Sequence, residues 1–187
     1  MRIMIRTVQS VALVLLFSFV ASAQAKLSDA EYEVFAAILG EGGLSVVVKD
    51  VESFKINNAA KAGKDIKTRL PAVNQDTLGE FLMQVNKPAT LEMRFPKDMA
   101  VALVTRKDIS LFFPKDLESG WKAFYERYPK TAGYYTFSRV GFSKDGRQAL
   151  LTVDVSCGSL CGEGYYYLLS KGDEGWNIVQ KSMTWIS

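Results

Sequence analysis

The chain has 187 residues, a formal net charge of +3 and no histidine. The absence of histidine excludes Ser-His-Asp and Cys-His nucleophile systems, because both use imidazole as the base. It also excludes the usual histidine-containing catalytic zinc sites. A charge this close to neutral differs from the basic excess of nucleic-acid-binding domains, so we expect no nucleic-acid partner. Any catalysis would have to rest on carboxylate, tyrosine, lysine or cysteine chemistry.

Residues 1–25 have the pattern of a secretory signal peptide. Arg2 and Arg6 form a basic region, residues 11–20 are apolar, and Ala23-Gln24-Ala25 fits a small-x-small cleavage site. The apolar run is only ten residues long, whereas a membrane-spanning helix needs about 20. We therefore expect a cleaved signal peptide and no membrane span after cleavage.

The mature chain is expected to begin at Lys26, with cleavage after Ala23 as an alternative and an uncleaved anchor as a less favoured one. Residues 26–187 are a usual length for one domain. The sequence thus predicts a single exported domain, in the periplasm or the extracellular medium.

The mature chain opens with a predicted helix over residues 28–39. Ser28-Asp29-Ala30-Glu31 matches a capping box, and apolar residues follow at helical spacing until a glycine-rich segment ends the run. Residues 44–48 are mostly β-branched and predict a strand. Residues 55–75 show no periodicity and carry five basic residues against one acid, Asp65. We interpret them as a solvated loop, with a patch for polyanions as the alternative.

The middle of the chain predicts four elements: a helix through residues 78–85, a strand at 99–104, a short helical turn over 105–112 and a helix through 121–128. Asp76 is the possible N-cap of the first of these helices, and Pro129 closes the last.

From Tyr134 onward the hydrophobic pattern has a period of two. It predicts four strands, near residues 134–142, 148–157, 164–170 and 176–186. Short turns between neighbouring strands indicate an antiparallel meander. The expected fold is α+β, with N-terminal helices packed on one face of a C-terminal curved antiparallel β-meander of about four strands.

The first hairpin of this meander defines a register. Asp145-Gly146 favours a two-residue type I′ turn, which would place Lys144 opposite Arg147. The same register places Val140, Phe142, Ala149, Leu151, Val153 and Val155 on one face, and Phe137 and Leu150 on the other.

On that second face the register places a candidate polar site. Arg139 would lie opposite Thr152 and diagonal to Asp154, within reach of an ion pair. Arg139, Asp154, Tyr165 and Tyr167 are the candidate ligand-binding residues. The alternative is a cross-strand ion pair with a structural role only.

Cys157 and Cys161 are the only cysteines of the chain. Two cysteines in an exported chain usually pair, and the neighbouring glycines permit a tight turn, so we expect a disulfide. A redox-active thiol pair and an anion-binding nest at the glycines are the alternatives. A structural metal site would need more ligands than two thiolates, and no metal or cofactor is expected.

Several of these segments together resemble a known group of sequences. The matching segments are Phe137-Ser-Arg-Val-Gly-Phe142, Cys157-Gly-x-Leu-Cys161-Gly-x-Gly-Tyr-Tyr, and Trp185-Ile-Ser187. They resemble a group of exported bacterial proteins of unassigned function. The arrangement of helices before a meander is also similar, at the level of fold, to nuclear-transport-factor-2-like and cystatin-like domains. These resemblances imply no catalytic residue.

The sequence therefore predicts an exported, non-enzymatic binding or interaction module, such as a periplasmic accessory protein or an inhibitor of a secreted enzyme. Its partner would be a protein or a small molecule. Two alternatives remain open: a cofactor-free enzyme with a pocket on the sheet face, and a thiol–disulfide redox protein.

Overall fold

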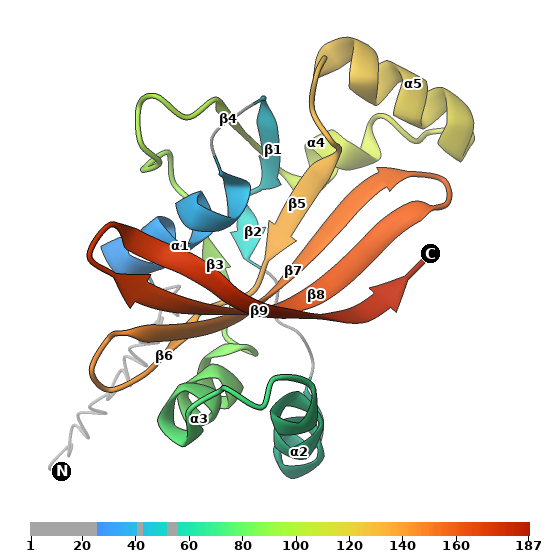
Figure 1. The fold of residues 1–187 in the computed structure, drawn as a ribbon. Helices are drawn as coiled ribbons and strands as arrows, with labels where there is room; N and C mark the ends of the chain where they lie inside the picture. Colours follow the sequence, from blue (N-terminus) through green and yellow to red (C-terminus); the bar gives the residue numbers. More distant parts are fainter. Residues whose placement is uncertain (1–25, 41–42, 52–55) are drawn as a thin grey trace, which may run out of the picture.

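The computed structural model describes residues 26–40, 43–51 and 56–187 (Figure 1). The predicted signal peptide lies outside these residues. Among the helices in the described ranges, none is long and apolar enough to cross a membrane.

Helices and short strands are interspersed in the first part of the chain, and strands alone form the last part. The helices are α1 (Asp29–Leu39), α2 (Ala59–Arg69), α3 (Gln75–Gln84), α4 (Arg106–Ser110) and α5 (Leu117–Arg127). The strands are β1 (Ser45–Val48), β2 (Asp50–Val51), β3 (Ala89–Thr90), β4 (Val101–Val104), β5 (Tyr134–Phe137), β6 (Gly141–Phe142), β7 (Gln148–Gly158), β8 (Cys161–Gly172) and β9 (Gly175–Ile186).

The described strands form one large sheet and one small one. The large sheet has seven strands in the order β4-β1-β5-β7-β8-β9, with β6 also paired to β7, while β2 and β3 pair separately. The C-terminal strands are antiparallel, as predicted, but β1 runs parallel to both β4 and β5. The expectation of about four strands was therefore too small, because the N-terminal strands extend the meander into a mixed sheet.

Helices cover both faces of this sheet, not one as predicted. Alternate residues of a strand point to opposite faces. On β7, Leu151 and Val153 pack in a cluster with α1, whereas Leu150 packs with α2 and α3. Figure 1 shows α1 on one side of the long strands and α2 and α3 on the other.

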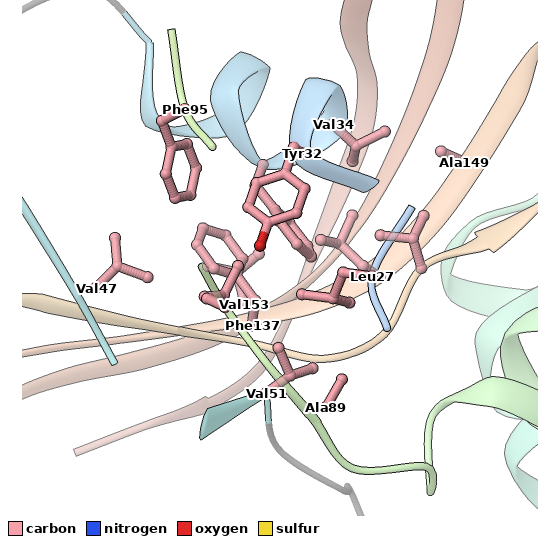
Figure 2. Packing of buried hydrophobic residues seen from close by; sticks show 14 of the residues in the cluster. Leu27, Tyr32, Val34, Val47, Val51, Ala89, Phe95, Phe137, Ala149 and Val153 are labelled. Atoms are coloured by element: carbon pink, nitrogen blue, oxygen red, sulfur yellow. The ribbon is translucent and has the colours of Figure 1, made fainter. Parts of the chain in front are cut away.

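The α1 cluster is the largest apolar core of the described chain. Figure 2 shows Tyr32 and Val34 of α1 close to Phe137 and Val153 of the sheet. The rings of Phe35 and Phe137 stack with their centroids 4.6 Å apart. Helix α1 begins as predicted, because Ser28 and Glu31 form both hydrogen bonds of a capping box.

Residues 59–69 form helix α2, so the prediction of a loop across residues 55–75 was wrong there. The Asn58 side chain accepts a hydrogen bond from the Lys61 backbone and caps the helix. Ile66 is the buried residue of this helix. One buried side chain within the helix gives almost no periodic signal in the sequence. Ile66 packs in the cluster with α3 and the sheet together with Leu70 and Val73, which follow the helix.

The N-cap of helix α3 is Asn74, so the prediction of Asp76 as the N-cap was wrong. Asp76 Oδ2 instead accepts a hydrogen bond of 2.8 Å from the Lys144 backbone N–H, in the turn after β6. The helix approaches β6 closely at Gly141, where an added Cβ would lie 2.2 Å from the Phe81 backbone nitrogen. Gly141 thus permits the contact between α3 and the sheet.

The hairpin register agrees with the prediction only near the turn. Phe142 pairs with Ala149 as predicted, but Phe137 pairs with Val153, one residue out of the predicted register. Residues 138–140 therefore form a bulge, and Phe137 lies on the α1 face, not on the second face with Leu150.

The turn itself also differs from the predicted two-residue type I′ turn. That turn needs positive φ at both central residues. Gly146 has φ 68°, but Asp145 does not have a positive φ. The backbone N–H of Gly146 bonds to the Ser143 carbonyl at 2.9 Å, and Ser143 opposes Gln148. The predicted pairing of Lys144 with Arg147 is therefore not formed.

Candidate functional site

The bulge directs Arg139 away from Asp154, so the predicted diagonal pair does not form. Arg139 Nε donates to Glu31 Oε1 at 2.7 Å, and its Nη2 donates to Glu31 Oε2 at 3.2 Å. Both side chains are buried. Arg139 is thus part of the attachment of α1 to the sheet, and lies apart from the other candidate ligand-binding residues.

Asp154 instead forms a hydrogen bond with Trp185, near the C-terminus. Its Oδ1 accepts a hydrogen bond of 2.9 Å from the indole Nε1 of Trp185 on β9. Burial raises the pKa of the Asp154 carboxyl above its usual value, and the indole N–H opposes this shift with a smaller effect. A partly buried carboxylate with a perturbed pKa marks this position as a candidate site.

Two glycines make room for the Trp185 ring. An added Cβ at Gly164 would lie 2.1 Å from Trp185 Nε1 and 2.4 Å from Asp154 Oδ1. An added Cβ at Gly162 would lie 2.9 Å from Trp185 Cζ3. The backbone N–H of Ser187 also bonds to the Gly162 carbonyl at 2.9 Å. The glycines after Cys161 and the final Trp-Ile-Ser segment are therefore parts of one contact.

Asp154 belongs to a strip of polar side chains on the face of the sheet that α2 and α3 also cover. We call it the polar strip: Thr136, Ser138, Thr152, Asp154 and Ser156. At one end it meets the cluster of Leu150 and Leu168 with α2 and α3. At the other, Ser156 pairs with Tyr134, which packs in the apolar cluster of α5. The polar strip thus separates two apolar clusters on the same face.

Tyr165 and Tyr167 lie on the opposite face of the sheet from Asp154. Their ring centroids are 5.9 Å apart. The Tyr165 hydroxyl donates to Glu163 at 2.9 Å, and Lys181 Nζ lies 4.8 Å from the centre of the Tyr165 ring. Burial is the main cause that raises the pKa of the Tyr167 hydroxyl, and the nearby Glu163 adds to it. The structure therefore brings the two tyrosines together, but not with Arg139 or Asp154.

Cys157 and Cys161 form the predicted disulfide, with their Cα atoms 5.0 Å apart. The bond closes the tip of the β7–β8 hairpin, and we call residues 157–161 the disulfide tip. The Tyr125 hydroxyl on α5 donates a hydrogen bond of 2.7 Å to the Cys157 carbonyl. Within the tip, the side chain of Leu160 is 88% exposed.

The end of β9 lies beside the disulfide tip and is also apolar. Ile186 pairs with Glu163 near the start of β8. Ile186 is 70% exposed and Trp185 is 39% exposed. Figure 1 shows the hairpin tip and the C-terminus at the same end of the sheet. Apolar side chains from the β7–β8 turn and from β9 therefore lie at the same end of the sheet.

Four hollows lined by described residues lie away from this end of the sheet. One is formed by α1 and the start of β9, with Glu33, Asp98, Glu174 and Trp176 in its lining. Another lies between α3 and the turn after β6. Two more lie between α2 and α3 and beside Arg94. None of these four is lined by Asp154, Tyr165, Tyr167 or the cysteines, and in the described chain no group of three or more carboxylates or cysteines could hold a metal.

Sequence reasoning missed Glu31 and Trp185 as the partners of Arg139 and Asp154. The signal for Trp185 was present in the glycine spacing, because Gly162 and Gly164 leave space above alternate positions of β8. The sequence did not indicate Glu31 as the partner of Arg139, because the capping box already explained the presence of a glutamate at this position.

Comparison of the chain with protein-family models, with curated proteins and with solved structures found no match.

Proposed function

We propose that the chain is an exported, non-enzymatic module that binds a partner protein through the disulfide tip and the end of β9. The observation that carries this proposal is Leu160, whose side chain is 88% exposed on a hairpin closed by a disulfide. A large apolar side chain so exposed gains free energy when a partner's pocket buries it. An accessory protein of the periplasm and an inhibitor of a secreted enzyme would both use such a surface.

The rigidity of the disulfide tip supports this role. The disulfide and the Tyr125 hydrogen bond to the Cys157 carbonyl hold the tip, and the Ser187 N–H bonds to the carbonyl of Gly162, the residue that follows it. A loop already fixed in its binding conformation loses little conformational entropy on association. The tip is therefore suited to insert Leu160 into a preformed pocket.

The end of β9 would enlarge the contact around Leu160. Trp185 and Ile186 are exposed beside the tip, and tryptophan is enriched among residues that dominate binding energy at interfaces. Leu160 would be the central anchor, with the two β9 residues at its border.

A photo-crosslinking experiment in the exporting host tests the proposal. A photoreactive amino acid replaces Leu160 in one variant and Asp173 in the other. Asp173 is an exposed residue of the β8–β9 turn, at the opposite end of the same strand, and serves as the matched control. We expect a discrete cross-linked partner from position 160 and none from position 173.

The captured partner is then tested with purified components. Leu160→Ser should weaken its binding by about tenfold or more, with the thermal unfolding midpoint unchanged. Equal cross-linking from both positions, or unchanged affinity of Leu160→Ser, would contradict the proposal.

A further inference from the structure

Asp154 is a partly buried carboxylate without a cationic partner in the described chain. Arg69, Arg94, Arg139 and Lys171 each form an ion pair with another carboxylate. Among the described residues, the Asp154 side chain accepts its hydrogen bond from the neutral indole of Trp185. A carboxylate removed from water is costly unless it is paired, and a neutral donor compensates for only part of that cost.

The neighbours of Asp154 in the sheet do not supply the missing charge. Across the strands it pairs with Thr136 on β5 and Gly164 on β8. The next residue of β7 on the same face, Thr152, pairs with Tyr166. These positions carry hydroxyl groups or no side chain, so the charge of an ionised Asp154 is open to a cation from outside.

A second polar group beside Asp154 also lacks a partner. The Thr152 hydroxyl oxygen is buried and has no hydrogen bond among the described residues, and the side chain as a whole is only 4% exposed. A buried hydroxyl without a partner is unusual in a folded protein. A bound N–H donor that entered the polar strip next to Asp154 would satisfy it.

Trp185 provides an aromatic wall next to the carboxylate. One side of its ring lies against Gly162 and Gly164, which fixes the position of the indole. The residue remains 39% exposed, so part of the ring is free to contact a ligand. Indole rings attract ammonium and guanidinium groups through the negative face of the π system.

We propose that Asp154, Thr152 and Trp185 form a binding site for a small organic cation of the ammonium or guanidinium type. The Asp154 carboxylate pairs with the charge, the Thr152 hydroxyl accepts an N–H, and the Trp185 ring contacts the apolar part of the ligand. This site lies on the polar strip, and it shares Trp185 with the proposed partner surface but not the anchor of that surface, Leu160.

Heteronuclear NMR of the indole N–H groups tests this proposal directly. The chain has three tryptophans, so the spectrum has three indole signals, and Trp185→Phe assigns the one that matters. The mature protein is titrated separately with choline, 1,4-diaminobutane and arginine amide, and with sodium chloride at matched ionic strength. We expect a saturable shift of the Trp185 signal with at least one organic cation and none with sodium chloride.

A pair of matched variants assigns the effect to the carboxylate. Asp154→Asn removes the charge from the site, and we expect it to weaken binding by about tenfold or more. Glu163→Gln also replaces a carboxylate by an amide. Glu163 precedes Gly164 on β8 and lies on the opposite face of the sheet, so this variant should leave the affinity for the cation unchanged. Leu160→Ser should also leave it unchanged, so failure of this site and failure of the proposed anchor Leu160 can be told apart.

The titration of the unaltered protein tests whether the site binds organic cations, even if Asp154→Asn does not fold. Absence of a saturable Trp185 shift with all three organic cations would overturn the proposal. An equal shift in Asp154→Asn, or in a Thr152→Val and Asp154→Ser double variant, would also overturn it.

Discussion

Glu31 and Arg139 are 108 residues apart in the sequence and form a buried ion pair, with Arg139 Nε 2.7 Å from Glu31 Oε1. The same Glu31 carboxylate accepts a hydrogen bond of 2.9 Å from the Ser28 backbone N–H. One side chain therefore both caps α1 and holds that helix against the bulge between β5 and β6. The start of the helix and the register of the sheet are coupled through this carboxylate.

Breaking this pair should cost much more than breaking an exposed one. Arg139→Ala leaves Glu31 buried without its cation, and we expect the free energy of unfolding to fall by about 3–5 kcal/mol. Lys171→Ala breaks the exposed pair with Glu33, which also joins α1 to the sheet, and should cost about 1 kcal/mol or less. Urea unfolding of both variants measures the difference. Similar losses in the two variants would contradict a special role for the buried pair.

Asp154 should make the protein less stable as the pH rises. Burial raises the pKa of its carboxyl in the folded state, so the folded protein holds the proton to a higher pH than the unfolded chain. Between the two pKa values stability then falls with increasing pH. Asp154→Asn should therefore be more stable than the unaltered protein at neutral pH. The difference should shrink as the pH falls through the folded pKa and vanish below the unfolded pKa, near about 4.

Asp145→Asn is the control, because we expect it to change the stability at neutral pH in the opposite direction. The Ser143 hydroxyl, first, and the Arg147 backbone N–H hold the pKa of Asp145 below its usual value. Stability from this group is present above the unfolded pKa and is lost as the pH falls through the folded pKa, so Asp145→Asn should be less stable at neutral pH. Unfolding by urea at several pH values compares both variants with the parent. A destabilising effect of Asp154→Asn at neutral pH would show that the hydrogen bond from Trp185 outweighs the burial of the charge.

The disulfide should make a modest and local contribution to stability. It closes a loop of only a few residues, for which the loop-entropy argument gives about 2 kcal/mol. We expect the Cys157→Ser and Cys161→Ser double variant to lose about that amount in urea unfolding, and to be insensitive to a reducing agent that destabilises the parent. Complete loss of the folded state would show instead that the tip is needed to assemble the sheet.

Gly164 should tolerate no side chain, because the Trp185 ring and Asp154 occupy the space of its Cβ. We expect Gly164→Ala to displace the indole, break its hydrogen bond to Asp154 and cost about 1–3 kcal/mol. Gly79→Ala on α3 is the control, since an added Cβ there meets nothing within 4 Å. It should stabilise the protein by about 0.5–1 kcal/mol through its effect on the helix. The fluorescence and the indole NMR signal of Trp185 should change only in Gly164→Ala.

Features set by neighbouring residues were predictable from the sequence. The capping box at Ser28 and Glu31, the strands of the C-terminal meander and the disulfide between Cys157 and Cys161 all depend on contacts a few residues apart or on regular alternation. Helix α2 was the local exception, because its one buried side chain, Ile66, gives no periodic pattern.

The candidate site was only partly predictable for the same reason. Asp154, Tyr165 and Tyr167 could be identified as polar or aromatic residues of strands. Their division between two faces, however, depends on the register of the sheet. A shift of one residue moves a side chain to the other face, and the bulge at residues 138–140 introduces such a shift for Arg139.

The sequence by itself determined the class of fold, the first helix, the order of the C-terminal strands and the disulfide. Only the tertiary structure decided that Arg139 pairs with Glu31, that Asp154 meets Trp185, and that helices cover both faces of the sheet. The physical reason is that a bulge is stabilised by contacts between segments far apart in the chain. Glu31 bonds to Arg139 and to the Val140 backbone at the bulge, 108 and 109 residues away in the sequence, and no pattern within the hairpin reveals this contact.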